Sequence, residues 1–207
     1  LGADGARSAV ARQTVPCSAD LKWVLAYHEI VEAPEQHNDH YDGDRCDVWY
    51  QGNLSPDFYA WVFPHGKHAS IGVGSEADGF SARHAVAALR EKTGLDTRQT
   101  VRREGAPIPM KPLKRWEDGK SVLLTGDAAG VVAPASGEGI YYAMLTGKLC
   151  AHAMAAYLQT ADSKQLAQAR KAFMRLHGKT FWVLGLLQRF WYSSDKRREK
   201  FVAMCND

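Results

Sequence analysis

The stretch over residues 121–150 constrains the fold of this chain more than any other part of its sequence. It reads SVLLTGDAAGVVAPASGEGIYYAMLTGKLC. An apolar segment over residues 121–125 leads into a glycine-aspartate pair, small residues, a proline and two further glycines. A short apolar run of this kind is typical of a buried strand in a parallel sheet, and a long helix is predicted over residues 137–158. The pattern therefore predicts a strand–turn–helix unit.

Each part of this turn has a chemical use. Gly126 allows a tight exit from the strand, and Asp127 at the carboxyl edge can accept hydrogen bonds from sugar-like hydroxyls. Gly137 and Gly139 expose N–H groups at a helix N-terminus, where the helix dipole amounts to roughly half a positive charge. That end would stabilise negative charge on a flat ligand such as a reduced flavin. Glu138 could donate a proton, or could be a first-turn acid that favours the helix dipole.

A second motif, an Asp-Gly pair, stands near the start of the sequence. Residues 2–12 read GADGARSAVAR, so Asp4 and Gly5 lead into a predicted helix over residues 6–12. Alone, an Asp-Gly pair is typical of any turn. Its place before the longer motif, with a strand-rich segment between them, supports a shared role for the two motifs.

The longer motif, GDAAG…P…SGEGI, resembles the second FAD fingerprint of the glutathione-reductase-type flavoproteins, in the branch shared by aromatic hydroxylases and geranylgeranyl reductases. The resemblance implies that Asp127 contacts the ribityl chain of FAD and that Asp4 lies near the pyrophosphate. Aromatic hydroxylases usually have a histidine after the two alanines, where this chain has Gly130; the Ser-Gly-Glu-Gly-Ile version is closer to the geranylgeranyl reductases. The residues assigned to the cofactor are Asp4, Gly5, Gly126, Asp127, Ala128, Gly130, Pro134, Gly137 and Gly139.

An aromatic strand stands out between the two motifs. Residues 57–64 read DFYAWVFP, similar to the Tyr-x-Trp-x-Phe-Pro stretch of the geranylgeranyl reductases. Tyr59, Trp61 and Phe63 alternate and so share one sheet face, which can wall a pocket for a long polyprenyl substrate. Alternatively they form the core between the sheet and a helix, and the two interpretations do not exclude each other. Strands are predicted over residues 23–33, 46–51, 59–64 and 68–74, a helix over 80–93 and an extended segment over 101–110.

The C-terminal part of the sequence is helical. One helix is predicted from after Asp162 to about residue 177, and an aromatic one over residues 179–192. A basic run over residues 196–200 follows. Aromatic and basic residues together suit a membrane interface, but packing on the domain, with the basic run as a solvated face, is the favoured interpretation.

These elements predict an α+β fold with α/β character. The resemblance implies that they form part of a glutathione-reductase-type FAD domain, an antiparallel-sheet substrate domain and a helical C-terminal tail. The FAD-domain segments are expected at residues 1–20 and 111–160, the sheet domain at 21–110 and the helical region at 161–207. No Gly-x-Gly-x-x-Gly unit that would hold the ADP part of FAD occurs in the sequence. The chain is therefore expected to be a C-terminal fragment, inactive in isolation.

The resemblance implies an FAD-dependent and NADPH-dependent reductase that saturates isoprenoid double bonds. Its expected substrate is a geranylgeranyl group, reduced to phytyl on (bacterio)chlorophyll or on geranylgeranyl diphosphate. One alternative is a flavin-dependent monooxygenase of the aromatic hydroxylase type. Another is a catalytically incomplete fragment that only binds lipid.

Composition excludes other classes. A net charge of +3 is too small to indicate nucleic acid as a partner. The four cysteines form no CxxC pair, which speaks against a zinc site and favours a reduced, cytoplasmic compartment. A polyprenyl substrate is compatible with peripheral membrane contact. His28, His37 and His40 lie near several acidic residues, but their spacing matches no metal-ligand pattern, so no metal is expected.

Overall fold

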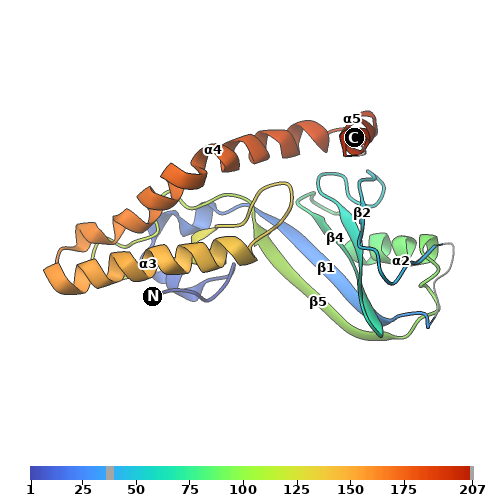
Figure 1. Ribbon diagram of the computed structural model, residues 1–207, viewed down its shortest axis with the longest axis horizontal. Helices are drawn as coiled ribbons and strands as arrows, with labels where there is room; N and C mark the ends of the chain where they lie inside the picture. Colours follow the sequence, from blue (N-terminus) through green and yellow to red (C-terminus); the bar gives the residue numbers. More distant parts are fainter. Residues whose placement is uncertain (36–39, 206–207) are drawn as a thin grey trace. The chain divides into compact units, whose positions relative to one another are not determined.

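The computed structural model describes residues 1–35 and 40–205 of the chain. The chain forms two compact units, each made of two separate segments (Figure 1). Unit 1 comprises Leu1–Trp23 and Pro107–Leu187, and unit 2 comprises Val24–Ala106 and Gln188–Asp207. The combination of one antiparallel sheet with several helices confirms the predicted α+β class.

Most of the sheet belongs to unit 2. Its five strands follow the order β2-β3-β4-β1-β5. β3 and β4 form a hairpin in which Trp61 lies opposite Gly72, and β4 pairs in turn with β1. The first four lie within a few residues of where alternating apolar residues and turn signals predicted them, and the fifth lies in the segment predicted to be extended. The strands are β1 (Trp23–Glu32), β2 (Asp47–Trp49), β3 (Ala60–His65), β4 (His68–Ser75) and β5 (Thr100–Pro109).

The two faces of the sheet differ because successive residues of a strand point to opposite sides. Ile71 of β4 and Val62 of β3 are buried on the face that helix α2 (Ala82–Lys92) covers. Gly72 and Gly74 of β4 lie on the opposite face, where their lack of a side chain leaves room for aromatic rings. One face therefore packs in a mainly aliphatic core, and the other carries aromatic rings at the surface.

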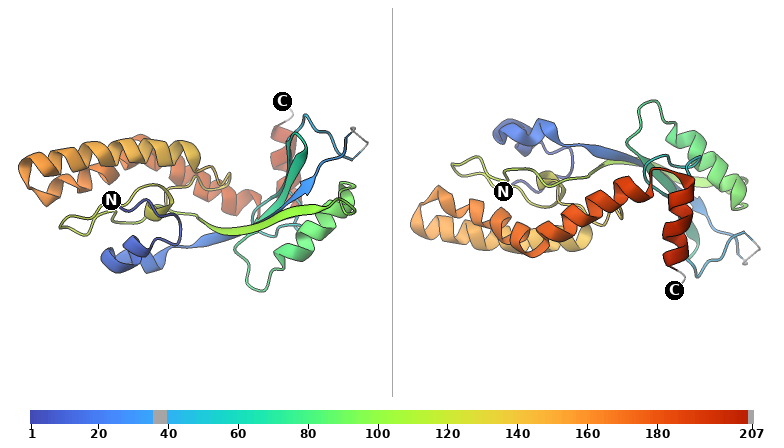
Figure 2. Two further views of the ribbon diagram at one scale, coloured as in Figure 1. Left: turned by 90° about the horizontal axis from the view of Figure 1, so that it is seen from below. Right: turned by 90° about the horizontal axis from the view of Figure 1, so that it is seen from above.

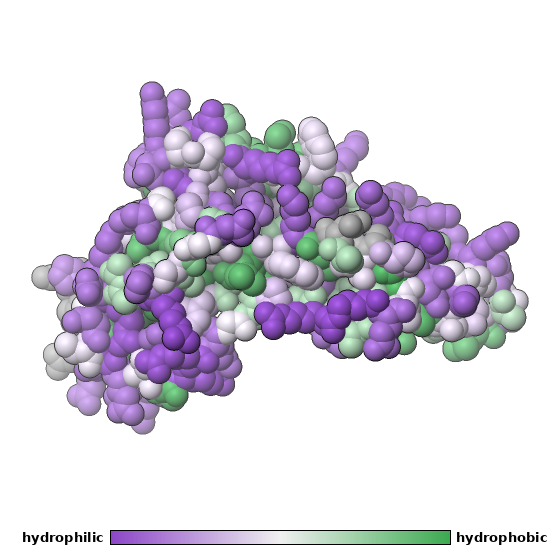
Figure 3. Space-filling model, turned by 180° about the vertical axis from the view of Figure 1, so that it is seen from behind, coloured by the Kyte–Doolittle hydropathy of each residue, from purple (hydrophilic) through white to green (hydrophobic). Residues whose placement is uncertain are grey.

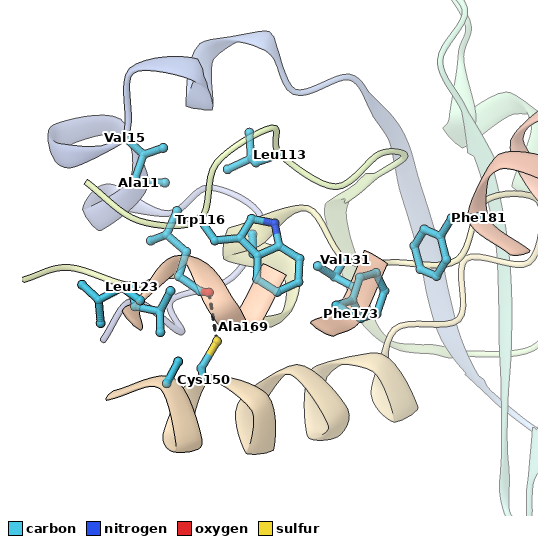
Figure 4. Packing of buried hydrophobic residues seen from close by; sticks show 14 residues of the cluster. Ala11, Val15, Leu113, Trp116, Leu123, Val131, Cys150, Ala169, Phe173 and Phe181 are labelled. Carbon is cyan, nitrogen blue, oxygen red and sulfur yellow. Dashed lines mark hydrogen bonds between the residues drawn. The ribbon is translucent and has the colours of Figure 1, made fainter. Parts of the chain in front are cut away.

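The core of unit 1 gathers around Trp116, which is fully buried. Its ring lies 5.5 Å from that of Phe173, centroid to centroid. Figure 4 shows this cluster, in which Cys150 Sγ donates a hydrogen bond of 3.4 Å to the carbonyl oxygen of Leu124. Helix α3 and the first half of α4 run side by side in Figures 1 and 2. The helices of this unit are α1 (Ala9–Thr14), α3 (Ile140–Thr160) and α4 (Ala167–Trp191), the last of which continues into unit 2.

The prediction of a strand over residues 121–125 is wrong, because the segment makes only isolated bridges. Leu124 makes one isolated parallel bridge with Gly2, and Leu123 makes one antiparallel bridge with Glu117. Leu123, Leu124 and Thr125 are nevertheless buried, and backbone groups of the segment bond to Gly2 and to the carbonyl oxygen of Trp116. An apolar run of five residues indicates burial, but it does not by itself indicate a strand ladder.

The predicted break between the two C-terminal helices is also wrong, because α4 runs without interruption through Gly178. A glycine inside a helix costs about 1 kcal/mol relative to alanine. The rings of Phe173 and Phe181, on either side of Gly178, both pack against the ring of Tyr142 in α3, at 6.1 and 4.9 Å. This packing holds both halves of α4 on the same neighbour.

A further helix, α5 (Asp195–Met204), contains the basic run. The interpretation of residues 196–200 as a solvated face is wrong for Arg198, of which only 3% is exposed. Its guanidinium donates hydrogen bonds to the carboxylate of Asp195 and to the carbonyl oxygens of Pro56 and Tyr192. Arg198 therefore fastens α5 to the loop that precedes β3, within unit 2.

Candidate functional site

Helix α3 holds the turn Gly126–Ala129 in place. The amide of Gly126 and the hydroxyl of Thr125 both donate to Thr146 Oγ1, at 3.1 and 3.0 Å. A Cβ atom at position 126 would lie 3.3 Å from the Cβ of Ala143, so the helix packs directly on the turn. This packing fixes the backbone from which the side chain of Asp127 projects.

The carboxylate of Asp127 is half-buried and accepts no hydrogen bond from the described residues. Burial raises its pKa above the ordinary value for an aspartate. A Cβ atom at Gly139 would lie 3.5 Å from Asp127 Oδ1, so the carboxylate lies beside the start of α3. A partly desolvated acceptor without a donor is costly, and hydroxyl groups of a ligand would remove that cost.

The start of α3 offers donors next to this acceptor. Gly137, with φ of +68°, ends the preceding loop, and the helix begins at Ile140, three residues later than predicted. The amides of Gly139 and Ile140 donate no hydrogen bond within the described part of the chain. Glu138 is exposed, and its Oε1 accepts from the amide of Tyr141 at 2.7 Å. Glu138 therefore caps the helix, while its role as a proton donor stays a prediction.

Three of the predicted cofactor residues, Ala128, Gly130 and Pro134, are packed inside the turn and the loop that follows it. Ala128 and Pro134 are buried. Gly130 has φ of +74°, and a Cβ atom there would lie 2.5 Å from the carbonyl oxygen of Lys111. Packing alone thus requires glycine at position 130, and contact of these three residues with a ligand stays a prediction.

The Asp-Gly motif near the N-terminus forms a helix cap. The carboxylate of Asp4 accepts hydrogen bonds from Ser8 Oγ at 2.5 Å and from the amide of Ala9 at 2.8 Å. The Ser8 bond is the main reason that the pKa of Asp4 lies below its usual value. Gly5 has φ of +80° and open space beside it. The expected contact of Asp4 and Gly5 with a pyrophosphate stays a prediction.

The three predicted substrate residues form an aromatic ladder in unit 2. The ring of Trp61 lies 6.0 Å from that of Tyr59 and 6.1 Å from that of Phe63. All three are partly exposed, on the face of the sheet opposite α2. The core between the sheet and helix α2 is therefore made by other residues, which leaves the ladder as a surface. Burial raises the pKa of Tyr59 to about 12, so its hydroxyl stays neutral at ordinary pH.

A polar cluster on the same face was not predicted. His28 Nδ1 lies 2.8 Å from Ser70 Oγ, which also accepts from Trp61 Nε1 at 3.2 Å. His28 Nε2 lies 3.0 Å from Glu104 Oε2. The cluster fixes the indole of Trp61 in the ladder. Its members are far apart in the sequence, and only the strand register brings them together.

Replacing Gly72 by alanine tests how tightly the ladder is built. A Cβ atom there would lie 2.1 Å from Trp61 Cζ2, and the indole cannot move without leaving Ser70. We expect the free energy of unfolding to fall by about 1–3 kcal/mol, as for other overpacking substitutions. Chemical denaturation measures the change. In the control G147A, where nothing lies within 4 Å of the added Cβ, unfolding should instead become harder by about 0.5–1 kcal/mol.

Metal binding finds no support in the described residues. No group of three or more histidine, cysteine or acidic side chains among them could hold an ion. Glu29, adjacent to His28, is engaged by Arg90, whose Nη1 lies 2.6 Å from Glu29 Oε2. His37 and Asp39, which the histidine-rich segment contains, lie outside the described residues.

Known proteins with similar sequences match this chain along its whole length. It is 52% identical over 207 residues to a geranylgeranyl diphosphate reductase of Rhodobacter capsulatus, covering all of this chain and 52% of that protein. It is 36% identical to a chloroplastic geranylgeranyl diphosphate reductase of Oryza sativa, covering 45% of that protein. The chain thus spans about half the length of the curated relatives it matches.

Solved structures show the same fold. A geranylgeranyl bacteriochlorophyll reductase-like protein from Thermoplasma acidophilum matches with a TM-score of 0.65 at 19% identity, over 88% of this chain and 52% of that one. The flavin-dependent halogenase CmlS matches with a TM-score of 0.60 at 13% identity, over 93% of this chain and 37% of that one. At such identities the likeness concerns the fold alone.

The family model for lycopene cyclase proteins matches residues 80–203, more than half of the chain. That model describes a family and says nothing of this chain's substrate. The whole-chain identities confirm the resemblance to geranylgeranyl reductases that the two motifs and the aromatic strand suggested. The chain therefore belongs to the lycopene cyclase protein family, and its sequence is similar to those of geranylgeranyl diphosphate reductases.

Proposed function

We propose that the whole protein to which this chain belongs is an FAD-dependent reductase of isoprenoid double bonds. The observation that carries the proposal is the half-buried carboxylate of Asp127, which has no hydrogen-bond donor among the described residues and lies beside the free amides that open α3. An acceptor next to two donors suits a ligand with both hydroxyl groups and electron-rich edges. Related sequences named geranylgeranyl diphosphate reductase supply the substrate class.

The residues present fit the flavin part of FAD. Asp127 would accept hydrogen bonds from ribityl hydroxyls, and the amides of Gly139 and Ile140 would face the pyrimidine edge of the ring. Bound FAD would supply a hydride acceptor and donor. The positive end of α3 would stabilise negative charge on the reduced ring. We assign residues 1–20 and 111–160 to the FAD domain on this basis, and NADPH is the proposed electron source.

The aromatic ladder would hold the substrate chain. Tyr59, Trp61 and Phe63 offer flat apolar rings, and the absence of a side chain at Gly72 leaves room for the ring of Trp61. A polyprenyl chain is apolar and flexible, so it is bound by shape and burial. An isolated double bond is unactivated, and placement and exclusion of water matter more than polar catalysis. Residues 21–110 would thus form the substrate domain.

Position 130 separates this proposal from a monooxygenase of the aromatic hydroxylase type. Such enzymes resemble this chain in the motif but usually carry a histidine there. In this structure a Cβ atom at residue 130 would lie 2.5 Å from the carbonyl oxygen of Lys111 and 2.8 Å from Leu21 Cδ2. The backbone of this turn therefore has no space for a histidine, which favours the reductase.

Product analysis tests the proposed activity. The full-length protein is incubated with NADPH and geranylgeranyl diphosphate, and the prenyl product is analysed by mass spectrometry. We expect products that have gained two hydrogen atoms for each double bond reduced. A product that carries an added oxygen atom would support the monooxygenase instead. If the protein binds the prenyl substrate but neither oxidises NADPH nor changes the lipid, it is only a lipid-binding module.

A further inference from the structure

Helix α4 has an unusual charge composition. None of its 25 residues is acidic, while Arg170, Lys171, Arg175, Lys179 and Arg189 are basic. An exposed helix of a soluble domain ordinarily mixes both signs of charge. The helix therefore presents positive charge without compensation from its own sequence.

The outward face of α4 combines these cations with large apolar side chains. Phe173 and Phe181 point inward to α3. On the opposite side, Lys171, Arg175 and Lys179 are followed by Trp182, Val183 and Leu186 at helical spacing. Trp182 is 70% exposed, Leu186 54% and Val183 42%. We call these six residues the α4 face: Lys171, Arg175, Lys179, Trp182, Val183 and Leu186.

Figure 3 shows hydrophobic side chains projecting among hydrophilic ones along the edge that α4 forms. The three cations of the α4 face take part in no ion pair among the described residues. A protein surface without acidic side chains that covered this face would have to bury three uncompensated positive charges, which is costly. A negatively charged surface with an apolar layer beneath it would pair with the three cations and bury the three apolar side chains of the face.

We propose that the α4 face binds the surface of a bilayer that contains anionic phospholipids. Trp182, Val183 and Leu186 enter the boundary between headgroups and acyl chains, where tryptophan is enriched. Lys171, Arg175 and Lys179 lie against the anionic headgroups. No described helix is both long and apolar enough to cross a bilayer, so this contact is a peripheral one. The inference stands independently of the proposed reductase activity.

Co-sedimentation of the full-length protein with vesicles tests the proposal. One set of vesicles contains phosphatidylglycerol and phosphatidylcholine, and the other contains phosphatidylcholine alone. We expect the protein to sediment with the anionic vesicles at low salt and to be released by high salt, because salt screens exposed charges. A protein that stays in the supernatant with anionic vesicles at low salt would overturn the proposal.

Two variants separate the halves of the face. In K171Q/R175Q/K179Q, the partition coefficient onto anionic vesicles should fall about tenfold or more. The control K114Q/K120Q/K164Q removes the same charge from exposed lysines elsewhere and should bind almost as wild type. In W182A/L186A, binding should weaken while its salt dependence remains, whereas L158A removes an exposed leucine of α3 and should change little.

Two outcomes would contradict the assignment. Equal loss of binding in the control and in K171Q/R175Q/K179Q would show that net charge, and not this face, attracts the vesicles. A change of molar mass by light scattering in W182A/L186A, without any vesicle binding by the wild type, would show that the face binds a second copy of the chain. Turnover of a detergent-dispersed substrate should be the same in all four variants, which separates this proposal from the proposed function.

Discussion

Replacement of Asp127 by alanine in the full-length protein is expected to lower the affinity for FAD about tenfold to a hundredfold. A hydrogen bond to a charged acceptor contributes roughly 1.5–3 kcal/mol, and each 1.4 kcal/mol is about a factor of ten. The flavin content on purification and a titration of the apo-protein with FAD measure the effect. The D127N variant keeps one acceptor oxygen and should retain part of the affinity.

The same substitution should leave the apo-protein as stable as before. The carboxylate of Asp127 has no donor among the described residues, and burial raises its pKa. The folded state therefore disfavours the charged form, so removing it does not lower the free energy of unfolding at neutral pH. The D78A variant, at an exposed loop position, is the control. Equal flavin content in D127A and the wild type would refute the role of Asp127.

Replacement of Arg198 by alanine is expected to lower the free energy of unfolding by roughly 2–4 kcal/mol, because several hydrogen bonds and a buried side chain are lost. The guanidinium is buried and donates to Asp195 and to the carbonyl oxygens of Pro56 and Tyr192. Its loss removes this donor from both carbonyl oxygens and opens a cavity under α5. Chemical denaturation measures the change, and hydrogen exchange should show α5 opening first.

The neighbouring lysines of α5 provide the matched control for Arg198. Lys196 and Lys200 are exposed on the same helix, so K196A and K200A should change the free energy of unfolding by no more than about 0.5 kcal/mol. If R198A were as stable as these variants, the role of Arg198 in holding α5 would be wrong. The lysines and the arginine look alike in the sequence, and only packing distinguishes them.

Local patterns predicted the sheet well. Alternation of apolar residues around turn signals at Pro56 and Gly66 placed β3 and β4 within one or two residues. Alternation also put Tyr59, Trp61 and Phe63 on one face, as the ring contacts confirm. The side on which α2 lies was not predictable, because a period of two residues defines two faces without saying which one a helix covers.

Long-range contacts decided what the sequence could not predict. Residues 121–125 read as a strand, but burial with two isolated bridges satisfies them equally well. The polar cluster of His28, Ser70 and Glu104 joins strands that are 42 and 76 residues apart in sequence. In the candidate site, the proximity of Asp127 to the start of α3 was expected from one short motif, whereas the capping contacts of Asp4 and Glu138 required the structure.

The anaerobic absorption spectrum of the purified full-length protein is the decisive test of whether a bound flavin reduces an isoprenoid. The protein is reduced with a stoichiometric amount of dithionite, so that no reductant remains, and geranylgeranyl diphosphate is then added without oxygen. We expect an oxidised flavin spectrum that bleaches on reduction and returns when the isoprenoid is added, together with a more saturated lipid. A colourless protein, or a flavin that stays reduced until oxygen is admitted, would contradict it.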